Sequence, residues 1–324
     1  MIEQGDSMNR VSTLSENQFL VNTLMNNQQQ MQEAQQQVTT GHKSQDYKGI
    51  ADQAEALIGS QSVASRTQQY ISGNNQLNLT LQTYDATTRG LASNAQAIKD
   101  AVMRAISTNS SSGLIDSVTN LLSQSLGQLN TQLNGQYIYG GTRTDTPPVN
   151  ITTPAQLVAM GQPPSAAFSN NQLKPQAQVN DNVTITYGQL ANQVGQPLLQ
   201  SIQRILQYNN GTLAGPSPPG PGTPFSDPMT QAQKDFLTGE LSSLSATVSG
   251  LNAAATQNGV LQQQLDNVQQ QNQSQLTTVN SFISDVQDAD AAQAITKLNQ
   301  DQLALQASYH VVAQLGKLSL ANFL

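Results

Sequence analysis

The sequence predicts a mainly α protein: a long antiparallel coiled coil or helical bundle formed by N- and C-terminal arms, with a small Pro-rich, β-containing middle domain. All thirteen prolines lie between Pro147 and Pro228. Because proline breaks helix interiors, residues 1–146 and 229–324 can form long uninterrupted helices, whereas the middle cannot. Both flanking segments carry apolar residues at alternating steps of three and four, the spacing of coiled coils.

The first arm spans residues 8–48 and consists of a helix followed by a hinge. Its repeat runs through Leu14, Asn17, Val21, Leu24, Gln28, Met31, Gln35 and Val38. Gly41 follows two threonines and can adopt the left-handed conformation that ends a helix. We therefore expect the helix to stop there and the chain to bend over residues 42–48.

Residues 49–146 are predicted to form the N-terminal part of a helical bundle. The cleanest repeat starts at Leu77 and continues to Ala105, and a turn is expected at Asn109–Gly113. A second helix, with apolar residues from Ile115 to Leu133 on one face, should pair with the first as an antiparallel hairpin. The glycines and alternating large residues of 134–141 then favour a short strand and a tight turn.

Residues 147–230 are predicted to be an outer domain that is rich in proline and contains β structure. Alternation over Val179–Tyr187 favours a strand pair, and Pro197–Tyr208 is expected to be a short amphipathic helix. The tract Gly215–Pro228 is expected to be an exposed, mobile loop.

Helix returns in residues 231–288, the C-terminal part of the bundle, and in 289–324, the C-terminal arm. The arm repeats the polar seam of the first through Ile295, Leu298, Gln302, Leu305, Tyr309, Val312 and Gly316. Glutamines at seam positions, such as Gln28 and Gln302, are equally compatible with fixing the register and with facing solvent.

The composition narrows the classes of partner. A net charge of −7 disfavours a phosphate-binding surface, so nucleic acid is not an expected partner. No apolar run is long enough for membrane insertion, and the N-terminus lacks the plan of a secretory signal. The chain has no cysteine, which fits either chance in a cytosolic protein or an exported protein that must avoid cross-links.

Residues that would carry chemistry are not clustered, so we predict no enzyme, no cofactor and no metal site. His42 and His310 stand apart from any ligand pattern in the sequence. The aspartates of 285–290 lack the glycine and glutamate of a calcium loop and favour helix capping. Gly140-Gly141 lacks the lysine of a phosphate loop and favours a turn.

The two ends of the chain together resemble the flagellin family. The similarity lies in Gln35–Lys43 with Gly49–Asp52 near the N-terminus, and in Ile283–Asp290 with Gln302–Ala307 near the C-terminus. Within the family, Leu133–Pro148 is most similar to the members that join hook to filament. Met8–Ser12 matches the usual start, so residues 1–7 are an extension or an alternative start.

The resemblance implies a structural subunit at the hook–filament junction, outside the cell, exported by the flagellar type III apparatus without a cleaved signal peptide. Its implied partners are further copies in a tubular axial assembly, the neighbouring hook-associated protein, flagellin and an export chaperone. The terminal arms would form the inner layer. The predicted assembly residues are Leu14, Val21, Leu24, Met31, Val38, Ile295, Leu298, Leu305, Tyr309 and Val312.

Other functions stay open at this point. A flagellin would have the same arms, and a surface adhesin on this scaffold would bind a glycan through the middle domain. A chemoreceptor ectodomain would need a membrane anchor, which the sequence does not show. A helical-bundle enzyme would need inward-facing carboxylate or histidine pairs, and the predicted seams contain none.

Overall fold

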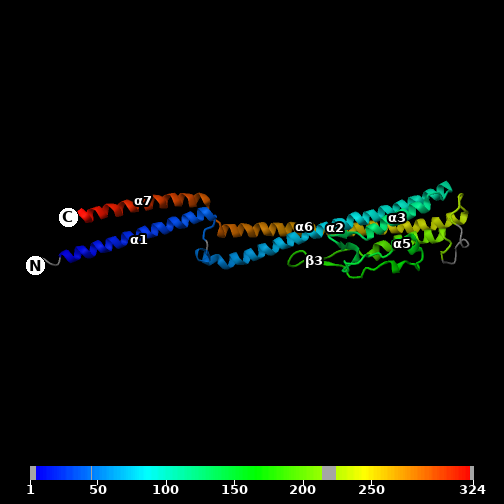
Figure 1. The fold of residues 1–324 in the computed structure, drawn as a ribbon, viewed down its shortest axis with the longest axis horizontal. Helices are drawn as coiled ribbons and strands as arrows, with labels where there is room; N and C mark the ends of the chain where they lie inside the picture. The colour runs from blue at the N-terminus through cyan, green and yellow to red at the C-terminus, as the bar shows by residue number, and fades with distance from the viewer. Residues whose placement is uncertain (1–4, 45, 214–223, 322–324) are drawn as a thin grey trace. The chain divides into compact units, whose positions relative to one another are not determined.

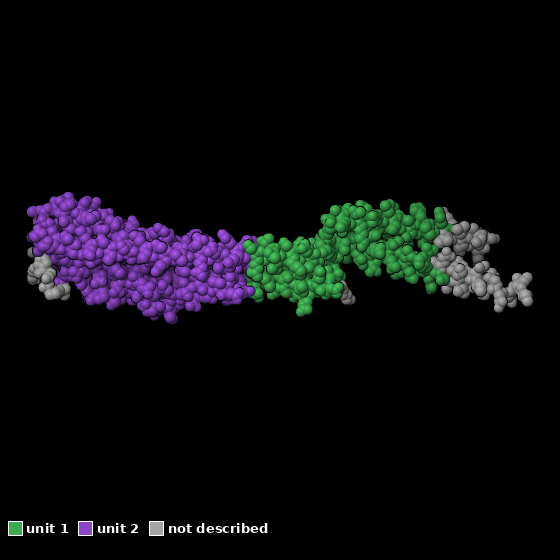
Figure 2. Space-filling model, turned by 180° about the vertical axis from the view of Figure 1, so that it is seen from behind, with its two compact units in different colours: residues 1–66, 274–324 green, residues 67–273 purple. Residues whose placement is uncertain are grey.

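The computed structural model describes residues 5–44, 46–213 and 224–321 and confirms the predicted mainly α fold (Figure 1). The chain divides into two compact units, residues 1–66 with 274–324 and residues 67–273 (Figure 2). The α-helices are α1 (Gly5–Thr40), α2 (Ala54–Thr108), α3 (Leu114–Leu129), α4 (Pro154–Val158), α5 (Ala191–Asn209), α6 (Gln231–Gln287) and α7 (Ala291–Ala321). The remaining elements are β1 (Gln132–Leu133), β2 (Gln136–Tyr137), β3 (Gln176–Gln178), β4 (Thr184–Thr186) and the 3-10 helices η1 (Tyr47–Gln53), η2 (Ile138–Gly140) and η3 (Ser165–Ala167).

In the first unit, α1 and α7 lie side by side and run in opposite directions, so the start of α1 and the end of α7 are at the same end of the pair (Figure 1). α1 stops where the sequence predicts. Gly41 has a φ of 74°, and its amide donates to the carbonyl of Gln37 over 2.9 Å. Glycine adopts this left-handed conformation without the steric penalty of a side chain, so it ends the helix cleanly.

The second unit is built on α2 and α3, which form the predicted antiparallel hairpin. The turn between them contains Asn109, with a φ of 54°, and Gly113, with a φ of 72°. Leucines of α3 at heptad-like spacing are buried against α2, and α5 and the first part of α6 complete the core. Its largest fully buried side chains include Tyr84, Tyr139, Leu91, Ile98, Leu122, Leu129, Ile151, Leu157 and Leu190.

The chain after α3 differs from the prediction at one point. Leu133, expected on the helix face, lies in strand β1, because α3 ends at Leu129. Asn130 accounts for this end: its side-chain amide donates to the carbonyl of Val149 over 2.9 Å, and its Oδ1 accepts from the Val149 amide over 3.0 Å. The short β1–β2 hairpin then turns at Asn134-Gly135, where both φ angles are positive, as two-residue hairpins require.

The β3–β4 hairpin of the middle segment is clamped onto α2 and α6 within the second unit. The buried side chains of Val179 and Ile185 pack with Leu77, Leu81, Leu265 and Val268. The carbonyl of Val179 accepts a hydrogen bond from Asn74 over 3.0 Å and another from Asn272 over 2.9 Å. One hairpin oxygen thus joins two helices, and both asparagines are buried.

Removing this clamp should release the hairpin. In the double variant Asn74→Ala and Asn272→Ala the buried carbonyl of Val179 loses both side-chain donors, at a cost of about 1–3 kcal/mol. We expect the amides of residues 176–186 to exchange hydrogen about 5- to 100-fold faster. Hydrogen exchange with mass spectrometry measures this, and the nearby exposed Gln76→Ala is the control that should leave the rate unchanged.

The rest of the middle segment agrees partly with the prediction. α5 begins six residues before the predicted start, so that Pro197 lies inside it. Most of the predicted loop Gly215–Pro228 falls outside the described residues. No described helix is both long and apolar enough to cross a membrane.

Candidate assembly surface

The two terminal helices are joined along their length by polar contacts as well as apolar ones. The side-chain amide of Asn27 donates to Oγ of Ser308 over 2.9 Å, and Gln28 donates to the hydroxyl of Tyr309 over 3.3 Å. These two bonds set the register between residues that are 281 positions apart in the chain. We call α1 and α7 together the arm pair.

The base of the arm pair is fixed by a short backbone bridge. The Ala289 amide donates to the carbonyl of Gly41 over 2.7 Å, and the Lys43 amide donates to the carbonyl of Gln287 over 2.8 Å. Nδ1 of His42 lies 3.2 Å from Oδ1 of Asp288. The predicted hinge after α1 and the break between α6 and α7 are therefore hydrogen-bonded to each other. Asp288 is the partner of His42, and the distance between the two residues in the sequence gives no sign of this contact.

Asp290 has the capping role that the sequence suggests for this acidic run. Its Oδ1 accepts from the amides of Ala292 over 2.9 Å and Gln293 over 3.2 Å, the first amides of α7. Among the described residues, no group of three or more histidine and acidic side chains has the geometry to hold a metal ion. The contacts of this region are those of a helix junction.

The structure places the ten predicted assembly residues in three settings. Leu305 is buried between the helices, and Leu24, Met31 and Leu298 are half-buried there. The side chain of Leu14 lies outside what the structure describes. The other five are exposed: Val21, Val38, Ile295, Tyr309 and Val312.

The observed seam thus differs from the predicted one at alternate positions. The inward-facing residues of α1 are Leu20, Leu24, Asn27, Met31 and Ala34, and those of α7 are Ala294, Leu298, Asp301, Leu305 and Ser308. In each helix the predicted row and the observed row have every second residue in common. At the remaining positions the inward-facing residue lies one residue earlier than predicted. Three of these earlier positions are small residues, Ala34, Ala294 and Ser308, and the two buried alanines let the helices approach closely there.

Large apolar side chains lie exposed on the arm pair. Phe19 is 70% exposed, Met25 is 61% exposed and Leu303 is 67% exposed. Together with Val21, Val38, Ile295, Tyr309, Val311 and Val312 they make up what we call the outer arm surface. These side chains are spread over both helices, and a partner protein that covered them would gain the free energy of burying their apolar area.

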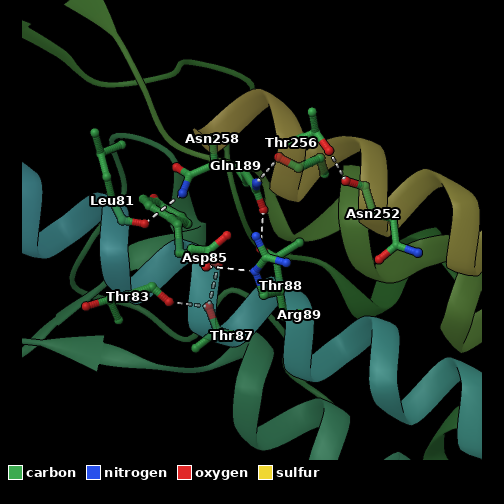
Figure 3. A network of polar contacts seen from close by, with 12 residues as sticks. Leu81, Thr83, Asp85, Thr87, Thr88, Arg89, Gln189, Asn252, Thr256 and Asn258 are labelled. Carbon is green, nitrogen blue, oxygen red and sulfur yellow. Dashed lines mark hydrogen bonds and ion pairs between the residues drawn. The ribbon is translucent and has the colours of Figure 1, made fainter. Parts of the chain in front are cut away.

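The second unit shows how this chain joins helices through polar side chains (Figure 3). Oε1 of Gln189 accepts from the Thr88 hydroxyl of α2 over 2.6 Å, while its amide donates to the Ala254 carbonyl of α6 over 3.0 Å. Nearby, the buried Asn258 donates to the Leu81 carbonyl over 2.7 Å. Because buried polar groups are costly when unpaired, such bonds fix one register between α2 and α6.

Two buried tyrosines anchor the segment after the β1–β2 hairpin. The ring of Tyr84 meets that of Tyr139 edge to face, with centroids 5.2 Å apart. The Tyr84 hydroxyl donates to the carbonyl of Ile138, and the Tyr139 hydroxyl shares hydrogen bonds with Thr87 and Thr88 over 2.6 and 3.0 Å. Burial raises the pKa of both phenols above the ordinary tyrosine value, which favours their neutral forms in the folded protein.

This pair predicts a loss of stability at high pH. In the unfolded chain the phenols ionise near pH 10, whereas their folded pKa values are higher, so the stabilisation is complete below about pH 10 and falls as the pH rises towards the folded values. Urea denaturation between pH 8 and 12 should show this decline. In the double variant Tyr84→Phe and Tyr139→Phe stability should be lower at pH 8 but decline less steeply; an equal slope would contradict the assignment.

Comparisons with known proteins agree with this architecture. Residues 241–324 match the family profile of the bacterial flagellin C-terminal helical region. A flagellar hook-associated protein from Vibrio parahaemolyticus is similar in structure, with a TM-score of 0.56 and 17% identity over 72% of this chain and 96% of the other. FlgL from Bacillus cereus aligns with a TM-score of 0.50 and 13% identity over 71% of this chain and 99% of its own.

Among curated proteins, none matches the chain significantly. The matched region 241–324 includes all of α7 and most of α6, and so the C-terminal half of the arm pair. The chain therefore has a C-terminal region of the flagellin type and a fold that it shares with flagellar hook-associated proteins.

Proposed function

We propose that this chain is a structural subunit of the bacterial flagellum, an adaptor at the junction between hook and filament of the kind called hook-associated protein 3. The observation that supports this most is the outer arm surface, carried by two terminal helices of which one belongs to a flagellin-type region. The fold shared with two flagellar hook-associated proteins supports the choice of the junction over the filament.

The arm pair suits a subunit whose terminal helices are paired in the free chain and gain further stability on assembly. Its seam contains Asn27, Ala34, Asp301 and Ser308, which bury little apolar area, while larger side chains remain outside. A long helix with so little buried surface is marginally stable by itself. Neighbouring copies would cover the outer arm surface and supply the missing stabilisation.

In this function the chain self-associates in a tubular axial assembly and contacts a neighbouring hook-associated protein on one side and flagellin on the other. It lies outside the cell, where the flagellar type III route with an export chaperone delivers it without a cleaved signal peptide. It acts without enzyme activity or cofactor, because its role is to match two different surfaces.

Deletion of the gene in its own host tests the proposal. Cells should keep hooks but lose attached filaments, and unpolymerised flagellin should appear in the medium; electron microscopy and blotting of the medium measure both. Complementation with the intact gene should restore filaments. Filaments that remain attached to hooks in the deletion strain would rule out an essential junction role and favour a minor flagellin or an adhesin.

A further inference from the structure

An open groove runs between α5 and α6 in the second unit and has a volume of about 910 Å³. One wall is a row of α6 residues at steps of four and three, all exposed and mostly small: Gly239, Ser243, Ala246, Gly250, Ala253 and Gln257. The other wall is a row of α5 at the same spacing: Gln193, Pro197, Gln200 and Arg204. Val194, Ser201, Thr247 and Leu251 line it more deeply and are buried.

A third helix that packs against a pair of helices contacts one row of residues on each of them, with this same spacing. Each step of four or three residues returns to the same face of an α-helix, so each row presents one continuous edge. Glycine, serine and alanine on the α6 edge allow the axis of a further helix to approach to about 8 Å, the short end of helix packing distances. Gly239 and Gly250 have open space where a side chain would begin.

The groove also holds an ion pair with unused hydrogen-bonding capacity. Nε of Arg204 donates to Oε1 of Glu240 over 2.6 Å, and no other hydrogen bond of this guanidinium is formed with the described residues. Glu240 is 3% exposed, and its Oε2 is buried without a hydrogen-bond partner in the described part of the chain. Desolvation raises the pKa of this carboxyl even beside Arg204, which shows that the arginine compensates its burial incompletely.

The charges around this pair select the chemistry of an incoming side chain. A carboxylate would approach Asp235 and Glu240, which line the same end of the groove, and an ammonium group would meet Arg204. A neutral carboxamide avoids both repulsions. Its oxygen accepts from the guanidinium Nη groups, and its amino group is a donor for the carboxylate.

The ends of the groove indicate a direction for the bound helix. Asp235 lies at one end and Lys174 lines the other, near Gln189 and Gln257. A helix carries partial positive charge at its N-terminus and partial negative charge at its C-terminus. The favourable orientation places the N-terminus by Asp235, so that the helix runs parallel to α6.

We propose that this groove receives a helix of a second copy of the same chain, with a glutamine or asparagine side chain placed at the Arg204–Glu240 pair. The occupant follows from charge complementarity: only 10% of the chain is charged, and its exposed helical surfaces, such as the glutamine-rich face of α1, carry the neutral carboxamides that the pair selects. The inference deepens the proposed function, on which it rests, by adding a contact between copies outside the arm pair.

Photo-cross-linking in assembled flagella tests the contact. A genetically encoded benzophenone amino acid in place of Gln257, an exposed long side chain of the groove wall, should yield a cross-linked dimer of the chain, and mass spectrometry should map the bond to a helix with glutamine or asparagine facing Arg204. The same amino acid at position 259, on α6 outside the groove, should give at least tenfold less dimer. Equal yields, no dimer, or cross-links only to another protein would overturn the proposal.

A matched pair of glycine variants adds a second measurement. Gly250 and Gly259 are both exposed in α6 with open space beside them, so leucine fits at either position and improves helix propensity. Gly250→Leu should fill the groove and reduce the dimer cross-linked from position 257 at least tenfold, whereas Gly259→Leu should leave it unchanged. Thermal melting by circular dichroism should show both variants folded; undiminished cross-linking in folded Gly250→Leu would contradict the contact.

The outcomes separate this inference from the proposed function. If the deletion strain keeps its filaments, the junction role is rejected, and a dimer cross-linked from position 257 still supports the groove contact. If the deletion strain sheds flagellin and no dimer forms from position 257, the junction role is retained and the groove contact is rejected.

Discussion

Replacing Gly141 with alanine should destabilise the second unit far more than the same change at Gly135. Gly141 has a φ of 72° and a ψ of −128°, a conformation almost confined to glycine. A Cβ would also lie only 2.6 Å from the carbonyl oxygen of Leu173, a backbone atom that cannot rotate away. Strain and overlap together predict a loss of about 3–5 kcal/mol, measured by urea denaturation.

Two other glycines separate the causes of this effect. Gly135 has a φ of 77° but open space around it, so Gly135→Ala should show the conformational strain alone, about 1–2 kcal/mol. Gly127 is exposed within α3 with no close neighbour, and Gly127→Ala should stabilise by about 0.5–1 kcal/mol. If Gly141→Ala costs no more than Gly135→Ala, the overlap with Leu173 has no energetic weight.

Removing residues 289–324 should unfold α1 as well as delete α7. Within the first unit α1 packs chiefly on α7, and a free helix with a polar surface and few ion pairs is marginal in water. Circular dichroism should therefore show the loss of the 36 helical residues of α1 in addition to the 31 of α7. The truncated subunit should also fail to restore filaments in the deletion strain.

Point variants in α7 provide the matched control for this truncation. Leu305 is 9% exposed in the seam, and Leu303 is 67% exposed two residues earlier in the same helix. Leu305→Gln should cost about 2–4 kcal/mol of arm pairing and speed hydrogen exchange in α1. Leu303→Gln should leave exchange unchanged in the free subunit, and any effect it has should appear only on assembly.

The sequence was sufficient to predict the long helices and several of the positions at which they end. Proline placement and heptad spacing predict α1, α2, α6 and α7, and Gly41 and the cluster after Thr108 mark ends that the structure confirms. These signals are local: each depends on conformations that single residues favour or exclude. Propensity and periodicity therefore suffice to read them.

The sequence was not sufficient to predict which residues of α1 and α7 face the partner helix at every position of the seam. In α1 the predicted and the observed inward rows share Leu24 and Met31, and in α7 they share Leu298 and Leu305. At the other positions of each row, the residue that faces inward is the one before the predicted residue. Both Leu20 and Val21 are apolar, so the choice between them depends on which face of α1 the partner helix covers and cannot be made from α1 alone. The groove beside α5 has the same origin: its rows belong to segments that meet only in the folded chain.

The backbone bridge between the end of α1 and the start of α7 has a consequence for how the molecule matures. It joins the N-terminal helix to the C-terminal helix, and the bond from Asn27 to Ser308 spans 281 positions. A chain that emerges N-terminus first must hold α1 without its partner until α7 appears, since contacts this distant close late. A formed arm pair therefore requires that the chain extends through α7, and chains that terminate earlier lack the paired surface that assembly would use.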